Sequence, residues 1–421
     1  MYRKETLPNG VRIITEEIPH VRSVAIGLWV GAGTRDEQED NAGISHFIEH
    51  MFFKGTLKRS AKDLAESLEA VGGQLNAFTA KEYTCYYAKI LDEDFDLAVD
   101  VLSDMYFNSR FEPKEIEKEK KVVVEEIKMY EDSPDELIHD VFTQAIWEGH
   151  PLGKPILGTA DSIAEMNRDK IDRYLKCHYA PQNLVIAVAG KISQQEVHAK
   201  LAPIFGLFQG ACNRILDHKP LAHPVIKHVA KETEQMQIVL GVPGLAQEDP
   251  KIYALHVLNN VLGGGLSSRL FQEVREERGM AYSIYSYHST FVDSGLFAVY
   301  AGTRPANSNS VIECILTEMA KLKNDGISRD ELDRTKAQIK GSLYLSVESV
   351  NSRMSRLGKN ELSFNRVISI DEVVEKLSKV TLNDVTELAR IMFDPKALAL
   401  TTIGPGRFDL DLPEVVKRVG L

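Results

Sequence analysis

Two segments of the 421-residue chain share one pattern at a constant spacing of 216 residues, and this repeat most constrains the fold. The segment FEPKEIEKEKKVVVEEI at 111–127 aligns with ISRDELDRTKAQIKGSL at 327–343. Each has acidic residues at its start and a basic stretch after them. A chain of this length is also too long for one ordinary hydrophobic core. The repeat therefore predicts one domain duplicated within the chain.

Each half mixes β-rich segments and amphipathic helical segments without strict alternation, which predicts the α+β class. We expect two homologous domains, each with a mainly antiparallel sheet and packed helices. In the first half, the pattern predicts a hairpin at 74–90, helices at 92–108 and 112–132, and a buried strand at 183–190. The second half is predicted to hold a strand at 236–244, a helix at 252–265, strands at 281–290 and 295–303, and a last strand at 398–404.

A weakly patterned stretch rich in Pro, His and Lys, NRILDHKPLAHPVIKH at 213–228, is the predicted interdomain linker. The expected domains are therefore 1–212 and 229–421.

Composition argues against several classes of protein. A net charge of −11 argues against a nucleic-acid-binding surface. No apolar run approaches the ~18 residues of a membrane span, and the first residues lack the apolar region of a secretory signal. The four cysteines are scattered without a CxxC pair, which fits reduced thiols in the cytoplasm. We therefore expect a cytoplasmic protein.

The stretch HFIEH at 46–50 is the candidate metal centre, on a helix predicted from about 43 to 53. His46 and His50 are four residues apart, so both side chains lie on one face of that helix and can converge on one Zn²⁺. Glu49 points roughly 100° away around the helix, where it can act as a general base on a water molecule. The alternative interpretation is a solvated helix face with two incidental histidines.

Acidic residues on the next long helix are candidates for the remaining ligand. Glu119 and Glu126 are seven residues apart and share one face. Glu125 has the same neighbourhood, and spacing alone does not choose between it and Glu126. The second half carries Ser342 at the position of Glu126 and no histidines at the positions of His46 and His50, so the shared fold does not require these residues.

HxxEH is the inverted order of the zinc-protease motif. On these residues the chain resembles the family of pitrilysin, insulin-degrading enzyme and the mitochondrial processing peptidase, and is most similar to its short bacterial processing-peptidase-like members. The resemblance implies one Zn²⁺ per chain, with a third ligand 76 residues after the second histidine, which is Glu126. It also implies a supporting acid one heptad earlier, which is Glu119.

Two further stretches carry the resemblance. GGQLNAFTAKEYTCYY at 72–87 looks like the substrate-binding edge strand of the family, with Asn76, Ala77, Phe78 and Thr79 as its core. VREERGMAY at 274–282 looks like the second-domain stretch that completes the active site, which implies roles for Arg275 and Tyr282. The resemblance further implies a homodimer, or a heterodimer with a related chain.

The sequence thus predicts a zinc metalloendopeptidase that cleaves extended peptides or unfolded segments, a processing-peptidase-like activity. Zn²⁺ would activate water, Glu49 would be the general base, and Arg275 and Tyr282 would donate hydrogen bonds to the oxyanion or substrate carbonyls. The alternative is a non-catalytic peptide-binding or partner subunit of a related heterodimeric protease.

Overall fold

The computed structural model describes residues 2–211 and 218–421. The chain forms two compact units, each assembled from three separate segments. The first unit contains 1–128, 154–217 and 345–367. The second unit contains 129–153, 218–344 and 368–421.

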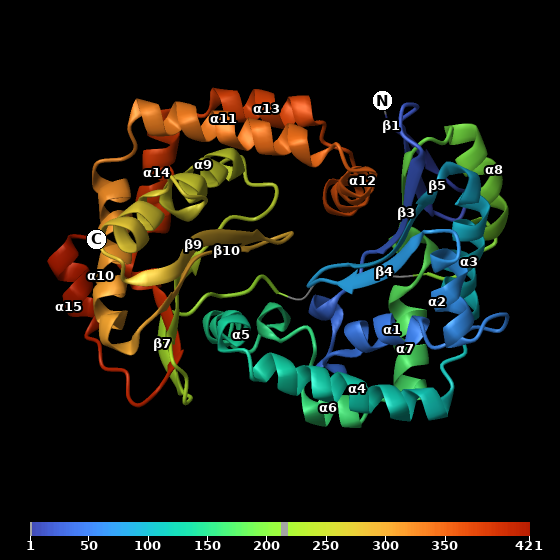
Figure 1. Ribbon diagram of the computed structural model, residues 1–421, viewed down its shortest axis with the longest axis horizontal. Coiled ribbons are helices and arrows are strands. Elements are labelled where there is room, and N and C mark those ends of the chain that lie inside the picture. Colours follow the sequence, from blue (N-terminus) through green and yellow to red (C-terminus); the bar gives the residue numbers. More distant parts are fainter. Residues whose placement is uncertain (1, 212–217) are drawn as a thin grey trace. The chain divides into compact units, whose positions relative to one another are not determined.

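Eleven strands are present in the described residues (Figure 1), and they are β1 (Tyr2–Thr6), β2 (Arg12–Glu17), β3 (Ser23–Val30), β4 (Gln74–Thr79), β5 (Thr84–Leu91), β6 (Leu184–Gly190), β7 (Val225–Ala230), β8 (Met236–Pro243), β9 (Ala281–Thr290), β10 (Gly295–Thr303) and β11 (Ala399–Gly404).

The helices are α1 (Ile44–Phe52), α2 (Ala61–Glu69), α3 (Phe95–Asn108), α4 (Pro113–Glu131), α5 (Pro134–Ile146), α6 (Ala160–Ala164), α7 (Arg168–His178), α8 (Gln194–Phe205), α9 (Ile252–Gly263), α10 (Ser308–Asn324), α11 (Arg329–Ser346), α12 (Val350–Phe364), α13 (Ile370–Lys379), α14 (Leu382–Met392) and α15 (Leu412–Val419). A π-helical segment, η6 (Phe271–Glu277), precedes β9.

The first unit is built on a six-stranded sheet of order β1-β2-β6-β3-β5-β4. Only β2 and β6 run parallel, and every other neighbouring pair is antiparallel. Alternate residues of the central strands enter two different hydrophobic clusters, because successive side chains point to opposite faces of a sheet. One face packs on α1, α2, α3, α7 and α8. This is the face that carries the candidate site.

The other face of this sheet is covered by α12, a helix from late in the sequence (Figure 1). Its buried residues Met354 and Leu357 pack with Trp29 of β3. Gly358 permits the close approach, because a Cβ atom there would lie 2.4 Å from the Trp29 ring.

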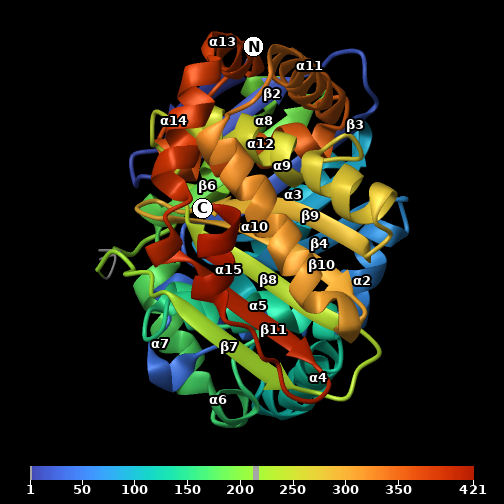
Figure 2. The same cartoon turned by 90° about the vertical axis from the view of Figure 1, so that its left-hand side faces the viewer.

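The second unit is built on a five-stranded sheet of order β7-β11-β8-β10-β9. This order matches β2-β6-β3-β5-β4 of the first unit strand for strand, and its one parallel pair, β7 with β11, takes the place of β2 with β6. Helices α10, α14 and α15 lie over one face (Figure 2). Helices α4 and α11 begin at Pro113 and Arg329, which are equivalent positions of the sequence repeat. The predicted duplication and α+β class are confirmed.

The opposite face of the second sheet packs on α5, whose residues Ile138, Phe142 and Ile146 join the cluster that contains Val239 and Ala298. Helix α5 comes from the first half of the sequence. Each unit therefore takes one covering helix from the other half of the chain.

This exchange is why the predicted continuous domains 1–212 and 229–421 do not describe the units. An amphipathic pattern reveals that a helix has an apolar face, but not which sheet that face covers. The predicted linker 213–228 also differs from the structure, because residues 225–228 belong to β7, which pairs with β11. Positions 213–217 of that linker lie outside the described residues. Among the described residues, no helix is long and apolar enough to cross a membrane.

Candidate metal centre

Helix α1 holds its polar residues in a fixed direction because its apolar residues are buried. The buried apolar residues follow the i, i+3, i+4, i+7, i+8 pattern of a core-facing helix, and they are Ile44, Phe47, Ile48, Met51 and Phe52. His46, Glu49 and His50 lie on the other side of the helix, where His46 is itself buried. The helix ends before Gly55, whose φ of +110° does not continue a right-handed helix.

Helix α4 supplies the acidic residues. Glu119 lies within the buried stripe formed by Ile116, Val123 and Ile127, and only 2% of its surface is exposed. Glu126 is half-buried beside the two histidines of α1. Glu125 points away and pairs with Lys128 at 2.7 Å.

His46, His50 and Glu126 form the one group of potential metal ligands in the parts of the chain that the structure describes. The Nε2 atom of His46 lies 3.8 Å from Oε1 of Glu126, and that of His50 lies 3.6 Å from Oε2. Both distances are too long for good hydrogen bonds. Two ligands of a tetrahedral zinc ion at 2.0–2.1 Å are separated by roughly 3.3–3.4 Å. The two nitrogen–oxygen separations are a few tenths of an ångström longer than this, so the three side chains could hold a zinc ion after a small adjustment. A fourth coordination position would remain for water.

A hydrogen bond fixes the His50 ring from its far side. Nδ1 of His50 lies 2.7 Å from Oε1 of Glu119, and Nζ of Lys54 lies 2.6 Å from Oε2 of the same carboxylate. Burial opposes the charge on His50, but the Glu119 carboxylate outweighs it and raises the His50 pKa. Burial likewise opposes ionisation of Glu119, but its contacts with His50 and Lys54 lower its pKa. A metal-facing histidine held by a carboxylate in this way keeps one tautomer and one orientation.

His46 is held differently. Its Nδ1 atom is buried and has no hydrogen-bond partner within the described chain. Burial, and secondarily the neighbouring His50, lowers the pKa of His46 to about 3, so the ring is neutral at physiological pH and Nε2 can offer a lone pair to a metal. Without a hydrogen bond at Nδ1, the position of this ring depends on the helix backbone and on the adjacent His50 ring, whose centre lies 4.5 Å away.

Glu49 lies next to the edge strand β4. Its Oε2 atom accepts a hydrogen bond from Oγ1 of Thr79 at 2.5 Å. Burial raises the pKa of Glu49, and the Thr79 bond works against that rise. A carboxylate placed beside a potential metal site can serve as a proton acceptor for a water molecule there.

Strand β4 contains Asn76, Ala77, Phe78 and Thr79 and lies at the edge of its sheet, as predicted. It pairs with β5 on one side, and no other described strand pairs with it. Phe78 packs edge-on against Trp29 at 5.6 Å between ring centres. The strand is thus firmly attached to the sheet and has one free backbone edge.

Comparison with known proteins places the chain in a family. Residues 12–160 match the family model described as insulinase (peptidase family M16), and residues 165–339 match the model described as peptidase M16 inactive domain. The chain belongs to peptidase family M16. The resemblance read from the motifs is thereby confirmed.

Curated relatives of this M16 chain are named zinc proteases. The uncharacterized zinc protease YmxG of Bacillus subtilis is 50% identical over 95% of this chain and 98% of its own. The uncharacterized zinc protease SCO5738 of Streptomyces coelicolor is 41% identical over 96% of this chain and 89% of its own. At the level of the family, this supports a zinc-dependent protease.

Among solved structures, a protease from Helicobacter pylori matches with a TM-score of 0.89 and 21% identity, over 96% of this chain and 99% of that one. A peptidase M16 inactive domain from Pseudomonas fluorescens matches with a TM-score of 0.90 and 20% identity, over 97% and 99%. At such identities these matches establish the M16 fold alone.

The second unit of this M16 chain has a different helix in the place of α1. Helix α9 follows β8 and precedes β9, as α1 follows β3 and precedes β4. It carries His256, but Asn260 stands four residues later, so there is no second histidine on that face. Nδ1 of His256 lies 3.1 Å from Nε2 of His288 in β9. The described part of this unit thus lacks the ligand set of the first.

Arg275 and Tyr282 both lie in the second unit, and their predicted roles at the zinc site stay predictions. Arg275 is in the π-helical segment η6, a geometry common at functional sites. Its guanidinium carbon lies 4.8 Å from the centre of the Tyr282 ring and 4.7 Å from that of Phe271. Tyr282 is 78% exposed. The two residues are thus mutual neighbours, with the Tyr282 ring directed to solvent.

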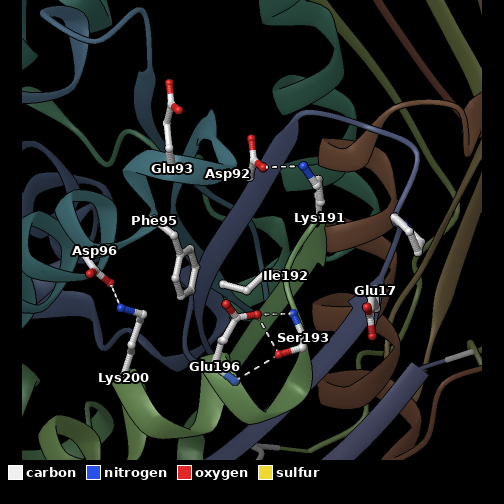
Figure 3. Close-up of a pocket in the computed structure, with 11 residues that line it drawn as sticks. Glu17, Asp92, Glu93, Phe95, Asp96, Lys191, Ile192, Ser193, Glu196 and Lys200 are labelled. Atoms are coloured by element: carbon white, nitrogen blue, oxygen red, sulfur yellow. Dashed lines mark hydrogen bonds and ion pairs between the residues drawn. The ribbon is translucent and has the colours of Figure 1, made fainter.

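A cavity of about 430 Å³ in the first unit lies apart from the metal centre, since none of its lining residues belongs to that centre (Figure 3). Its lysines are paired with acids, Lys191 with Asp92 at 2.9 Å and Lys200 with Asp96. Both lysines of the lining are thus neutralised, and the described lining residues include no cluster of potential metal ligands.

The sequence analysis did not single out Lys54 or Glu37. Lys54 lies just beyond the end of α1, so helical spacing does not mark its contact with Glu119. Glu37 lies in the segment before α1, and no local pattern marks its contact with that helix.

Proposed function

We propose that this chain is a zinc metalloendopeptidase that hydrolyses peptide bonds of extended peptides or unfolded segments. The observation that carries the proposal is the convergence of His46, His50 and Glu126 at zinc-ligand separations, with both Nε2 atoms facing the carboxylate. The proposed stoichiometry is one Zn²⁺ per chain. The zinc-protease names of the curated relatives support this assignment.

A bound Zn²⁺ would polarise the scissile carbonyl and lower the pKa of an attacking water. Glu49 takes a proton from that water and delivers it to the leaving amine. Thr79 holds the Glu49 carboxylate through the hydrogen bond to Oε2. Glu119 fixes the ring of His50 and does not itself meet the substrate.

The proposed substrate-binding surface is strand β4. A peptide that adds to this edge as an extra strand would gain backbone hydrogen bonds without a strong demand on its sequence. The Thr79–Glu49 bond links this strand to the proposed base, so a peptide paired with residues 76–79 would pass beside Glu49. Addition as a strand requires an extended substrate.

Arg275 and Tyr282 are proposed to complete the active site as hydrogen-bond donors to the oxyanion or to substrate carbonyls. The support for this is their match to the family stretch at 274–282 and the exposure of Tyr282.

We propose a dimer, either of identical chains or with a related chain, as implied for short members of the family. The proposed compartment is the cytoplasm, supported by Cys85, Cys177 and Cys314, which are all free thiols. The net charge of −11 supports peptides rather than nucleic acids as partners.

The deciding experiment measures zinc content of the purified chain together with cleavage of a quenched basic peptide, with and without a chelator. About one zinc per chain and chelator-sensitive cleavage are the expected results. Zinc without cleavage would mean that activity needs a different partner chain. Neither zinc nor cleavage would contradict the proposal and favour the non-catalytic binding subunit.

A further inference from the structure

Glu37 is a buried carboxylate in contact with the helix that carries the zinc ligands, and the mechanism above does not use it. Only 3% of its surface is exposed. Its Oε2 accepts a hydrogen bond from the backbone N–H of Gly43 at 2.7 Å, and its Oε1 accepts one from the N–H of Ser45 at 2.9 Å. Both oxygens are therefore occupied by the first turn of α1, and Ser45 directly precedes His46.

Helices usually satisfy their first N–H groups with a side chain at the N-cap position. In α1 that position is Gly43, which has no side chain, and its φ is +85°. A Cβ atom there would lie 2.7 Å from the carbonyl oxygen of Leu157 and 2.9 Å from Cα of Gly158. A conventional capping residue does not fit at this position. The carboxylate of Glu37 supplies the missing acceptors from outside the helix, and a negative charge there also complements the helix dipole.

The two zinc-binding histidines differ in how they are fixed. His50 is held through its Nδ1 by Glu119, whereas Nδ1 of His46 has no partner among the described residues. The His46 ring contacts the His50 ring at 4.5 Å between centres, and beyond that its position depends on the backbone of the first turn. Glu37 holds this backbone on both sides of Ile44. Ser45 is held a second time, because its Oγ lies 2.8 Å from the hydroxyl of Tyr174.

We propose that Glu37 is a positioning residue for the zinc ligand His46, which it controls by clamping the backbone of residues 43–45. This inference rests on the proposed zinc-peptidase function and adds a residue to it. Loss of the clamp would let the first turn of α1 fray and would weaken zinc binding, even though Glu37 touches neither metal nor substrate.

The test compares wild type, Glu37→Gln and Glu361→Gln. Glu361 is the matched control because it is fully buried and paired, with Lys4 at 2.6 Å and Arg12 at 3.3 Å, on a helix remote from these contacts. Zinc affinity is measured by competition with a chromophoric chelator, and the Co²⁺-loaded proteins are compared by visible absorption. Burial raises the pKa of Glu37 to about 7, so the measurements are made at pH 8, where its carboxyl is largely ionised.

We expect Glu37→Gln to weaken zinc binding about 10–100-fold, as is typical for the loss of a group that orients a metal ligand, and to change the cobalt spectrum. Glu361→Gln should keep the zinc affinity within about twofold of wild type and leave the cobalt spectrum unchanged, although this variant lowers the melting temperature. In metal-free protein, amide hydrogen exchange should accelerate at residues 43–46 in Glu37→Gln alone. Wild-type zinc affinity and exchange in Glu37→Gln would overturn the inference.

If Glu37→Gln does not fold, the same measurements are made on Glu37→Asp, which keeps the charge but reaches less far. Faster exchange at residue 45 with weaker zinc binding supports the clamp, and unchanged values overturn it. Wild-type protein that binds no zinc would overturn the proposed function and this inference together. Wild-type protein that binds zinc and cleaves peptide, beside an unaffected Glu37→Gln, would overturn this inference alone.

Discussion

Nδ1 of His50 lies 2.7 Å from Oε1 of Glu119, and this partly buried contact joins the proposed zinc helix α1 to helix α4. The other oxygen of Glu119 is paired with Lys54 at 2.6 Å. The carboxylate thus takes up one contact on each oxygen and can remain charged although it is buried. One residue of α4 fixes the orientation of a ligand that α1 supplies.

Replacement of Glu119 should therefore weaken zinc binding without removing a ligand. We expect Glu119→Gln to lower zinc affinity about 10–100-fold, because the His50 ring loses its charged partner. A chelator-competition titration measures this. Glu117→Gln is the control, since Glu117 lies on the same helix but is exposed and paired with Lys120. Equal affinities of the two variants would argue against the orienting role of Glu119.

The choice between two adjacent acids gives a second prediction. Glu126→Gln should lose most bound zinc, whereas Glu125→Gln should keep about one ion per chain, because Glu125 points to solvent and pairs with Lys128. Metal content by elemental analysis after dialysis decides this. Zinc loss in the Glu125 variant alone would reverse the assignment.

The role of Glu49 as general base can be tested separately from zinc binding. Glu49→Gln should retain zinc but reduce kcat about 10²–10⁴-fold, since an amide cannot accept the proton of the attacking water. The comparison needs zinc content and peptide cleavage on the same preparation. A zinc-loaded variant with wild-type kcat would refute the role of Glu49.

A substitution at Thr79 perturbs the Glu49 carboxylate less than replacement of Glu49 itself. Thr79→Val removes the hydrogen bond to Oε2 of Glu49 while keeping the β-branched shape that suits a strand. We expect zinc content to be unchanged and kcat to fall by roughly tenfold, the equivalent of one ordinary hydrogen bond. A change in KM with kcat unaffected would instead assign Thr79 to substrate binding alone.

A pH-dependent contribution to stability is expected in the second unit. Burial alone would raise the pKa of Glu331, but the contacts with Arg269 at 2.7 and 3.0 Å and with Ser328 outweigh it and hold the pKa at about 2. A lowered carboxyl pKa stabilises the folded state above the unfolded value of 4.5, and this contribution is lost as pH falls from 4.5 toward 2.

Glu331→Gln should accordingly lower the free energy of unfolding at pH 7, by about 1 kcal/mol because the pair is partly solvated. The difference from wild type should shrink at pH 3. Urea unfolding at both pH values provides the measurement. A difference that is the same at pH 3 and pH 7 would contradict the ionic origin of the effect.

Local periodicity was sufficient for much of the fold. The helix at α1, the edge strand β4 and the repeat of α4 and α11 are all consequences of patterns within about 20 residues, or of one constant offset. Helices α5 and α12 were different. Their apolar faces are visible in the sequence, but each helix packs on a sheet built mainly from the other half of the chain. No local pattern indicates which sheet a helix will cover.

The sequence by itself determined which residues could bind the metal. The spacing of His46 and His50 places both on one helix face, and family resemblance distinguished Glu126 from Glu125. The resemblance also implied a supporting role for Glu119, and the tertiary structure shows that role as a contact with His50. Only the tertiary structure decided the other supports: Lys54 on Glu119, Thr79 beside Glu49, and Glu37 at the first turn of α1. The physical reason is that residues three or four apart on a helix meet through backbone geometry alone, whereas most of these supporting contacts join elements that only packing around the core brings together.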